Sequence, residues 1–184
     1  MKNRATDMVL ISLFTALTVV GAFVKIPIPH VPLTLQTLMV MLAGLILGSR
    51  RGALSQVLYL FLGLLGLPIF AQGGGPAYIL QPSFGFLLGF IAGAYIIGKM
   101  VEREKNLSPF RTLMALICGQ LAVYLLGISY LYLNLNFILH KPISLLAAFK
   151  IGVLIFIPGD ILKTTVAAMV VAPIRQRLIS YIRS

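Results

Sequence analysis

Six apolar segments, separated by short breaks rich in proline, glycine or charge, make up most of this sequence. Each is close to the length of about 20 residues that crosses a bilayer as a helix. Charged residues contribute only 10% of the chain, against about 25% in soluble domains, and so few charges cannot cover a water-facing surface. The pattern therefore predicts an all-α membrane protein, a bundle of six transmembrane helices. The segments span residues 8–24, 31–47, 53–70, 84–101, 113–135 and 143–171.

Nothing longer than a short loop separates these segments, so we expect one integral membrane domain over residues 1–184. The sixth segment is longer than a straight crossing requires, and we expect it to be tilted or broken. Pro158 and Gly159 lie inside it, and proline lacks the N–H that a continuous helix needs. We expect a bend or a break at this dipeptide.

Fifteen basic residues against four acidic ones give the chain a net charge of +11. In a soluble protein this charge would suggest nucleic-acid binding. With six crossings, both termini and alternate loops fall on one side, together with eleven of the fifteen basic residues. Because basic loops stay in the cytoplasm, we predict a multi-pass protein of the cell membrane with both termini cytoplasmic. Its surroundings are then membrane lipid, and no nucleic-acid partner is expected.

Catalytic and metal-binding signatures are missing from the sequence. One cysteine and two histidines far apart offer neither an intrachain disulfide nor a metal site. The sequence has no Walker A motif, no Gly-x-Ser-x-Gly and no His-Glu-x-x-His. We expect no catalytic activity, no metal and no cofactor.

Asp160 is the one acidic residue inside an apolar segment, and Lys163 follows three residues later. This spacing puts both side chains on the same face of a helix. Each charge near the centre of a bilayer costs about 2.5–3.5 kcal/mol on insertion scales. Because charged residues are so costly inside a membrane, their presence there predicts a functional site. The alternative is a neutralised salt bridge that only fixes helix packing.

Two further regions carry polar groups that a simple membrane anchor would not need. Thr34 and Gln36 open the second apolar segment among apolar neighbours. The loop 71–83 has no charge and contains three consecutive glycines, with Gly74 in the middle, followed by Tyr78 and Gln81. Glycines let a loop move or approach a ligand closely. We interpret this loop as a lid over an outward-facing pocket, and a flexible connector is the alternative.

Small residues predict how the helices pack. Glycines recur every fourth residue at 44, 48 and 52 and at 85, 89 and 93, and we expect them to pack helices inside the bundle. The first segment presents Ser12 and Ala16 beside other small residues, a smooth face with no evident internal packing role. This face is a candidate docking surface for a partner protein.

Several of these motifs together resemble the BioY family, the biotin-binding S components of energy-coupling factor (ECF) transporters. The resemblance is ordered and runs from the first apolar segment to the sixth. It implies six helices, capture of biotin from outside, and docking onto a transmembrane T component that carries two cytoplasmic ATPases, which would hydrolyse ATP. The matching stretches are Pro32-Leu-Thr-Leu-Gln36-Thr, Leu42-Ala-Gly-Leu-Ile-Leu-Gly48, Tyr59 to Ala71, Gly73-Gly74-Gly75, Gln81-Pro82-Ser83-Phe84-Gly85 and Ile157-Pro-Gly-Asp160-Ile-Leu-Lys163.

Under this resemblance, Asp160 accepts hydrogen bonds from the ureido N–H groups of biotin, and Lys163 meets an oxygen of the ligand. Which end of biotin faces Lys163 stays open. The family's first helix is expected to dock through Ala-x-x-x-Ala, and here Ser12 takes the first position and Ala16 the second. Polar contacts to biotin would be completed by Gln36, Tyr78 and Gln81, with Thr34 and Gly74 as further candidates.

Two other functions are compatible with the residues alone. The chain is a stand-alone proton-coupled carrier if Asp160 exchanges a proton as it releases Lys163. It is a scaffolding subunit without a ligand if the glycine packing is its main feature, although the pair in the sixth segment then has no explanation.

Overall fold

The computed structural model describes residues 4–104 and 107–183, with the backbone alone for residues 172–183. Nearly all regular structure in it is helical, and the only sheet of the described chain is a two-stranded hairpin, β1–β2. The elements are α1 (Arg4–Phe23), β1 (Lys25–Ile26), β2 (Leu33–Thr34), α2 (Gln36–Leu47), α3 (Ser49–Leu64), the 3₁₀ helix η1 (Pro76–Leu80), α4 (Phe84–Val101), α5 (Pro109–Leu133), the π-helix η2 (Asn134–Ile138), α6 (Leu145–Phe149), the π-helix η3 (Lys150–Leu154) and α7 (Ile157–Arg183).

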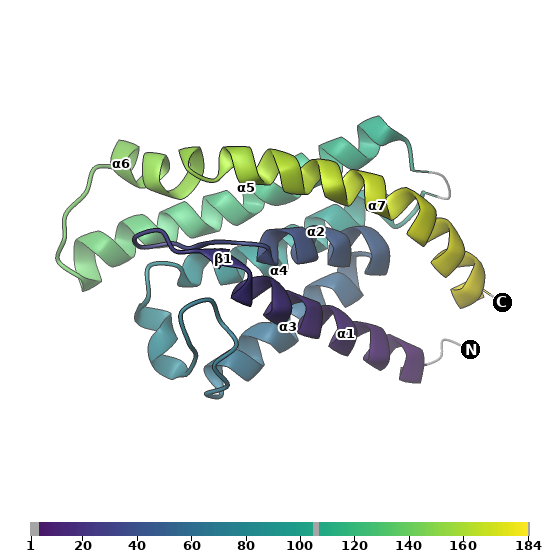
Figure 1. Cartoon of the computed structure of the whole chain (residues 1–184), viewed down its shortest axis with the longest axis horizontal. Coiled ribbons are helices and arrows are strands. Elements are labelled where there is room, and N and C mark those ends of the chain that lie inside the picture. Colours follow the sequence, from purple (N-terminus) through teal and green to yellow (C-terminus); the bar gives the residue numbers. More distant parts are fainter. Residues whose placement is uncertain (1–3, 105–106, 184) are drawn as a thin grey trace.

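The helices run back and forth along the long axis, and both ends of the chain lie at the same end of the bundle (Figure 1). By length and composition, three helical stretches of the described chain can cross a membrane: Arg4–Phe23, Phe84–Val101 and Pro109–Ile138. A bent pair, Leu145–Leu154 with Ile157–Val171, makes a fourth. Helices α2 and α3 have 12 and 16 residues, shorter than the segments expected there.

The boundaries predicted around α2 and α3 were wrong. Residues 31–35 are not helical, because β2 pairs with β1 and the N–H of Leu35 donates to the carbonyls of Gly21 and Val24 at 3.1 and 3.2 Å. The basic stretch expected as a loop at 49–52 is the first turn of α3. Gly48 alone separates the two helices, with a φ of 80°, a left-handed conformation that glycine adopts without strain.

The predicted break in the sixth segment is confirmed. The axes before and after it differ by 42°. The break lies just before Ile157, so Pro158 and Gly159 belong to the first turn of α7 rather than to the bend itself. Proline fits a first turn because its missing N–H would have no partner there. The break therefore puts Asp160 near a new helix start.

Glycines pack helices closely inside the bundle, as predicted. A Cβ at Gly85 of α4 would lie 2.2 Å from the Cβ of Tyr130 on α5. A Cβ at Gly44 of α2 would lie 2.8 Å from a backbone oxygen of Ala94 on α4. The glycine row at 44, 48 and 52 does not follow one helix, since Gly48 is the link between two.

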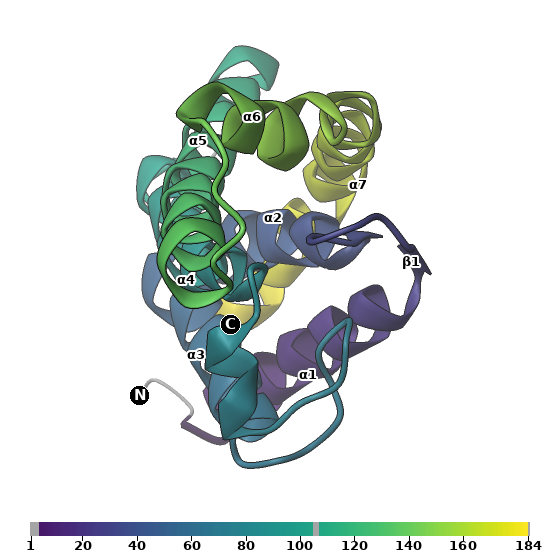
Figure 2. The same ribbon diagram turned by 90° about the vertical axis from the view of Figure 1, so that its left-hand side faces the viewer.

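Helix α1 contacts α2 and α3, and α2 lies between α1 and α7 (Figure 2). The hydroxyl of Thr15 donates to the carbonyl of Ser55 on α3 at 2.9 Å, and Thr18 is also buried. Thr15 and Thr18 are among the small residues beside Ser12 and Ala16, and they therefore have an internal packing role, which the sequence did not indicate. Ser12 and Ala16 are exposed on the outside of the bundle.

Three of the four acidic residues form ion pairs at the end where the termini lie. Asp7 pairs with Arg51 at 2.7 Å, and Glu104 pairs with Arg111 at 2.6 Å. Glu102 contacts Lys99 at 3.1 Å and accepts from the backbone N–H of Ser49 at 3.3 Å. The contact between Glu102 and Ser49 joins the end of α4 to the start of α3. Asp160 is then the one acidic residue in the middle of the bundle.

Candidate ligand-binding site

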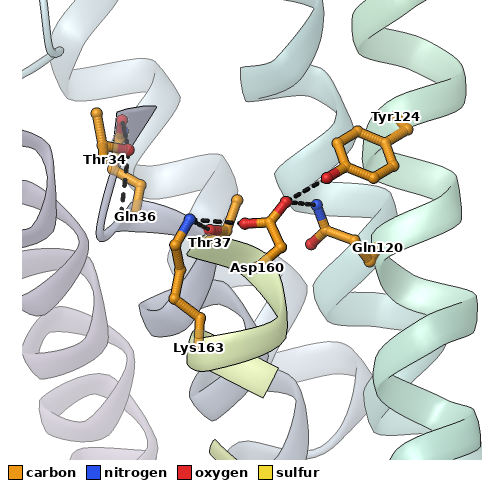
Figure 3. Close-up of polar contacts among 7 residues, drawn as sticks. All are labelled: Thr34, Gln36, Thr37, Gln120, Tyr124, Asp160 and Lys163. Carbon is orange, nitrogen blue, oxygen red and sulfur yellow. Dashed lines mark hydrogen bonds and ion pairs between the residues drawn. The ribbon is translucent and has the colours of Figure 1, made fainter. Parts of the chain in front are cut away.

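The site is built around Asp160 and Lys163, which lie on one face of the first turns of α7. Both residues are buried, with 6% and 5% of their surface exposed. The ammonium of Lys163 donates to Oδ1 of Asp160 at 2.7 Å and to the hydroxyl of Thr37 on α2 at 2.8 Å (Figure 3). The predicted pairing on a shared helical face is confirmed.

The other carboxylate oxygen of Asp160 faces α5 (Figure 3). Oδ2 accepts from the side-chain amide of Gln120 at 3.0 Å and from the hydroxyl of Tyr124. An ionised carboxylate can accept about four hydrogen bonds, and an ammonium can donate three. The described contacts therefore leave Asp160 about one acceptor position and Lys163 one N–H donor, side by side.

A small cavity of about 40 Å³ lies against this pair. Its apolar wall includes Phe86, Phe90 and Phe156, and its polar positions include Thr34 and Gln36. An apolar enclosure with a few convergent polar groups is typical of small-molecule sites. The volume suits on the order of three water molecules, so a larger ligand requires neighbouring side chains or loops to move.

Thr34 and Gln36 lie at the cavity but also bond within the protein. The Thr34 hydroxyl donates to the amide oxygen of Gln36 at 3.0 Å, and the Gln36 amide nitrogen donates to the hydroxyl of Tyr59 at 2.7 Å. Tyr59 in turn donates to the carbonyl of Ile69 at 3.0 Å. This chain connects the start of α2, through α3, to the loop that follows α3.

That loop, residues 65–83, is folded onto the bundle rather than extended. Tyr78 is buried at the cavity, with its ring 4.5 Å from that of Phe70 and its hydroxyl 3.3 Å from the Ser83 hydroxyl. A Cβ at Gly74 would lie 2.0 Å from the carbonyl oxygen of Leu67. Gly74 therefore serves close packing of the loop on itself, whereas Gly73 and Gly75 adopt the positive φ values of 118° and 94° that the turn requires.

The structure brings together five of the seven predicted binding residues and separates two. Asp160, Lys163, Gln36, Thr34 and Tyr78 line the cavity. Gly74 and Gln81 are exposed and are not part of its lining. In the present conformation the loop turns these two residues outward, away from the cavity. Their role in binding stays a prediction.

Gln120 and Tyr124 are polar residues of the site that sequence reasoning missed. Thr37 belongs to the polar start of the second apolar segment but was not among the predicted binding residues. Gln120 is an amide in the middle of an apolar segment, and Tyr124 follows four residues later on the same helical face. This spacing was a usable signal. The sequence did not show, however, that Gln120 and Tyr124 point at Asp160. This orientation follows from the packing of α5 against α7.

Comparisons with known proteins agree with one another. The model of the BioY family matches residues 1–180. A protein described as a probable biotin transporter BioY, from Lysinibacillus sphaericus, is 41% identical over 185 residues, which cover 100% of this chain and 92% of that one. The biotin transporter BioY of Rhodobacter capsulatus is 42% identical over 178 residues, 92% of this chain and 93% of that one.

A third relative, the biotin transporter BioY of Thermotoga maritima, is 37% identical over 159 residues, covering 86% of this chain and 89% of its own length. Among solved structures, the crystal structure of the S-component for biotin from an ECF-type ABC transporter matches with a TM-score of 0.82 and 28% identity. The match covers 96% of this chain and 95% of that one. The likeness thus extends over the whole fold.

Proposed function

The chain belongs to the BioY family, and we propose that it is the biotin-binding S component of an ECF-type ATP-driven importer. It captures biotin from outside the cell and has no catalytic activity of its own. The observation that carries this proposal is the buried Asp160–Lys163 pair, which lines a cavity and keeps hydrogen-bonding capacity unused.

The chemistry of biotin suits this pair. A cyclic ureido group presents an N–H donor and the carbonyl acceptor side by side on one edge. Asp160 has about one acceptor position left and Lys163 one donor, so the two complement that edge. The second ureido N–H requires another acceptor, which Thr34 and Gln36 at the same cavity offer. The aromatic wall formed by Phe86, Phe90 and Phe156 suits the thioether ring.

We propose that the chain crosses the cell membrane six times, with both termini in the cytoplasm. Helices α2 and α3 of 12 and 16 residues are about 18 and 24 Å long, so the folded segments 31–35 and 65–83 complete those two crossings. Irregular backbone is tolerated at membrane depth where it is buried in protein or lines a cavity. The ion-paired end of the bundle faces the cytoplasm, in keeping with its basic residues.

The proposed partners are a transmembrane T component and two cytoplasmic ATPase subunits. The chain has no nucleotide-binding motif, so ATP hydrolysis falls to those subunits. Ser12 and Ala16 are small and exposed on α1, and a face of this kind lets a helix of the T component approach closely.

Equilibrium binding of biotin to the detergent-solubilised protein tests the proposal. We expect tight binding by the wild type and loss of tight binding in Asp160→Asn and Lys163→Ala, because each variant leaves the other partner buried and unpaired. Thermal unfolding and gel filtration monitor folding of the variants. A folded double variant that binds biotin as well as the wild type would refute the site, and a wild type that binds no biotin would refute the function.

A further inference from the structure

Lys25 is a basic residue, outside the pair already described, that contacts a residue of the cavity wall. It begins β1, in the half of the molecule away from both termini (Figure 1). Its ammonium donates to the carbonyl oxygen of Ala71. Ala71 is buried and lines the cavity. Lys25 is not itself a lining residue of this cavity, so its positive charge lies just outside the cavity, at its rim, where the hairpin meets the loop 65–83.

This charge has no acidic partner among the described residues. The sequence has four acidic residues, and all four pair with other bases: Asp7 with Arg51, Glu102 with Lys99, Glu104 with Arg111 and Asp160 with Lys163. The Ala71 carbonyl uses one of the three N–H donors of the Lys25 ammonium. The rim thus presents a cation with unused donors and no counter-charge.

Lys25 and Lys163 both line a second pocket, which adjoins the central cavity at Thr34. Lys25 is paired in register with Thr34 across the hairpin, and Thr34 lines both the central cavity and a neighbouring pocket of about 310 Å³. Lys25 and Lys163 both line that pocket, whose other walls are mainly apolar. An elongated ligand with polar ends and an apolar middle matches this arrangement.

We propose that Lys25 binds the carboxylate of the ligand at the rim, while Asp160 and Lys163 hold the ureido end inside. This inference rests on the proposed function and deepens it, because it assigns the orientation of biotin. The carboxylate supplies the missing counter-charge of Lys25, and ammonium–carboxylate hydrogen bonds are among the stronger ones in proteins. Specificity for an acid over its neutral analogues comes from this one residue.

The test compares biotin with biotin amide, in which a neutral carboxamide replaces the carboxylate. We expect the wild type to prefer biotin. In Lys25→Met, biotin affinity falls roughly ten- to a hundredfold, the effect of losing a hydrogen bond to a charged group, while the affinity for biotin amide stays unchanged. Lys25→Arg retains the preference for biotin. Lys141→Met, at an exposed lysine of the loop after η2, is the matched control and leaves both affinities unchanged.

Two results would overturn the assignment. Equal losses for biotin and biotin amide in Lys25→Met would mean that Lys25 only ties the hairpin to the loop 65–83. Unchanged biotin affinity in this variant would mean that the carboxylate lies elsewhere. A wild type that binds neither compound would instead refute the proposed function, and the inference with it.

Discussion

Gln120 and Asp160 lie on different helices, and the amide nitrogen of Gln120 donates to Oδ2 of Asp160 at 3.0 Å. The hydroxyl of Tyr124 donates to the same oxygen (Figure 3). Lys163 and Thr37 lie on the opposite side of the carboxylate. Asp160 is thus held from α5 as well as from its own helix, and the direction in which it presents its remaining acceptor position depends on these contacts.

Tyr124→Phe and Gln120→Leu should each weaken biotin binding although neither removes the ion pair. Loss of one hydrogen bond to a buried charged group corresponds to roughly a ten- to hundredfold loss of affinity. Isothermal titration calorimetry on the purified variants measures it. Tyr132→Phe, on the same helix but outside the cavity lining, is the control. Wild-type affinity in both site variants would show that α5 does not orient Asp160.

Gly74→Ala should destabilise the loop 65–83. The added Cβ would lie 2.0 Å from the carbonyl oxygen of Leu67, so the backbone has to shift. We expect a lower Tm in detergent and weaker biotin binding, because the loop carries Tyr78 at the cavity. Gly159→Ala makes the same chemical change where the nearest atom is at 3.4 Å, an ordinary contact, and should leave Tm near that of the wild type. Equal Tm values for the two variants would contradict this account.

Glu102 predicts a pH dependence of stability. Hydrogen bonds from Ser49, together with the nearby Lys99 ammonium, hold the pKa of Glu102 below its ordinary value of 4.5. A carboxylate whose pKa is lower in the folded state stabilises the fold above the unfolded-state pKa and loses that contribution as the pH falls. Thermal unfolding at pH 7 should therefore show Glu102→Gln below the wild type.

The difference in Tm between the wild type and Glu102→Gln should shrink as the pH is lowered through and below 4.5. Ser49→Ala removes the hydroxyl that donates to Glu102. In this background, the Tm difference between the protein with Glu102 and its Glu102→Gln variant should change less with pH. A difference that is constant with pH would mean that the glutamine acts through packing, and that the charge of Glu102 contributes nothing.

Ser12→Leu and Ala16→Leu should impair assembly and leave biotin binding intact. Both positions are exposed on α1 and lie outside the cavity lining, so a larger side chain blocks only close approach by another helix. Co-purification with the T component and the ATPases measures assembly. Val9→Leu is the control, because it places a leucine at another exposed position of α1 outside the small-residue face.

Transport assays on the same proteins separate an S component from a stand-alone carrier. In liposomes, we expect uptake of biotin only when the T component, the ATPases and ATP are all present, and reduced uptake with Ala16→Leu. Uptake driven by a pH gradient into liposomes that contain this chain alone would overturn the assignment as an S component.

Local patterns in the sequence were sufficient to predict three features: a membrane protein, the break in the sixth segment and the pairing of Asp160 with Lys163. These depend on hydropathy over about 20 residues and on the period of one helix, which are properties of neighbouring residues. The same reasoning failed at Gly48, where the conformation of one residue joins two helices, and at residues 31–35, where contacts with α1 prevent a helix from starting.

Tertiary structure alone decided which polar residues meet. Gln120 and Tyr124 reach Asp160, and Thr37 reaches Lys163, because α2, α5 and α7 pack around one cavity. Gly74 and Gln81 turn outward, and Lys25 comes to the rim, because the loop and the hairpin fold back over that cavity. Such contacts join residues tens of positions apart, and their geometry is set by helix packing and loop closure rather than by any spacing along the chain.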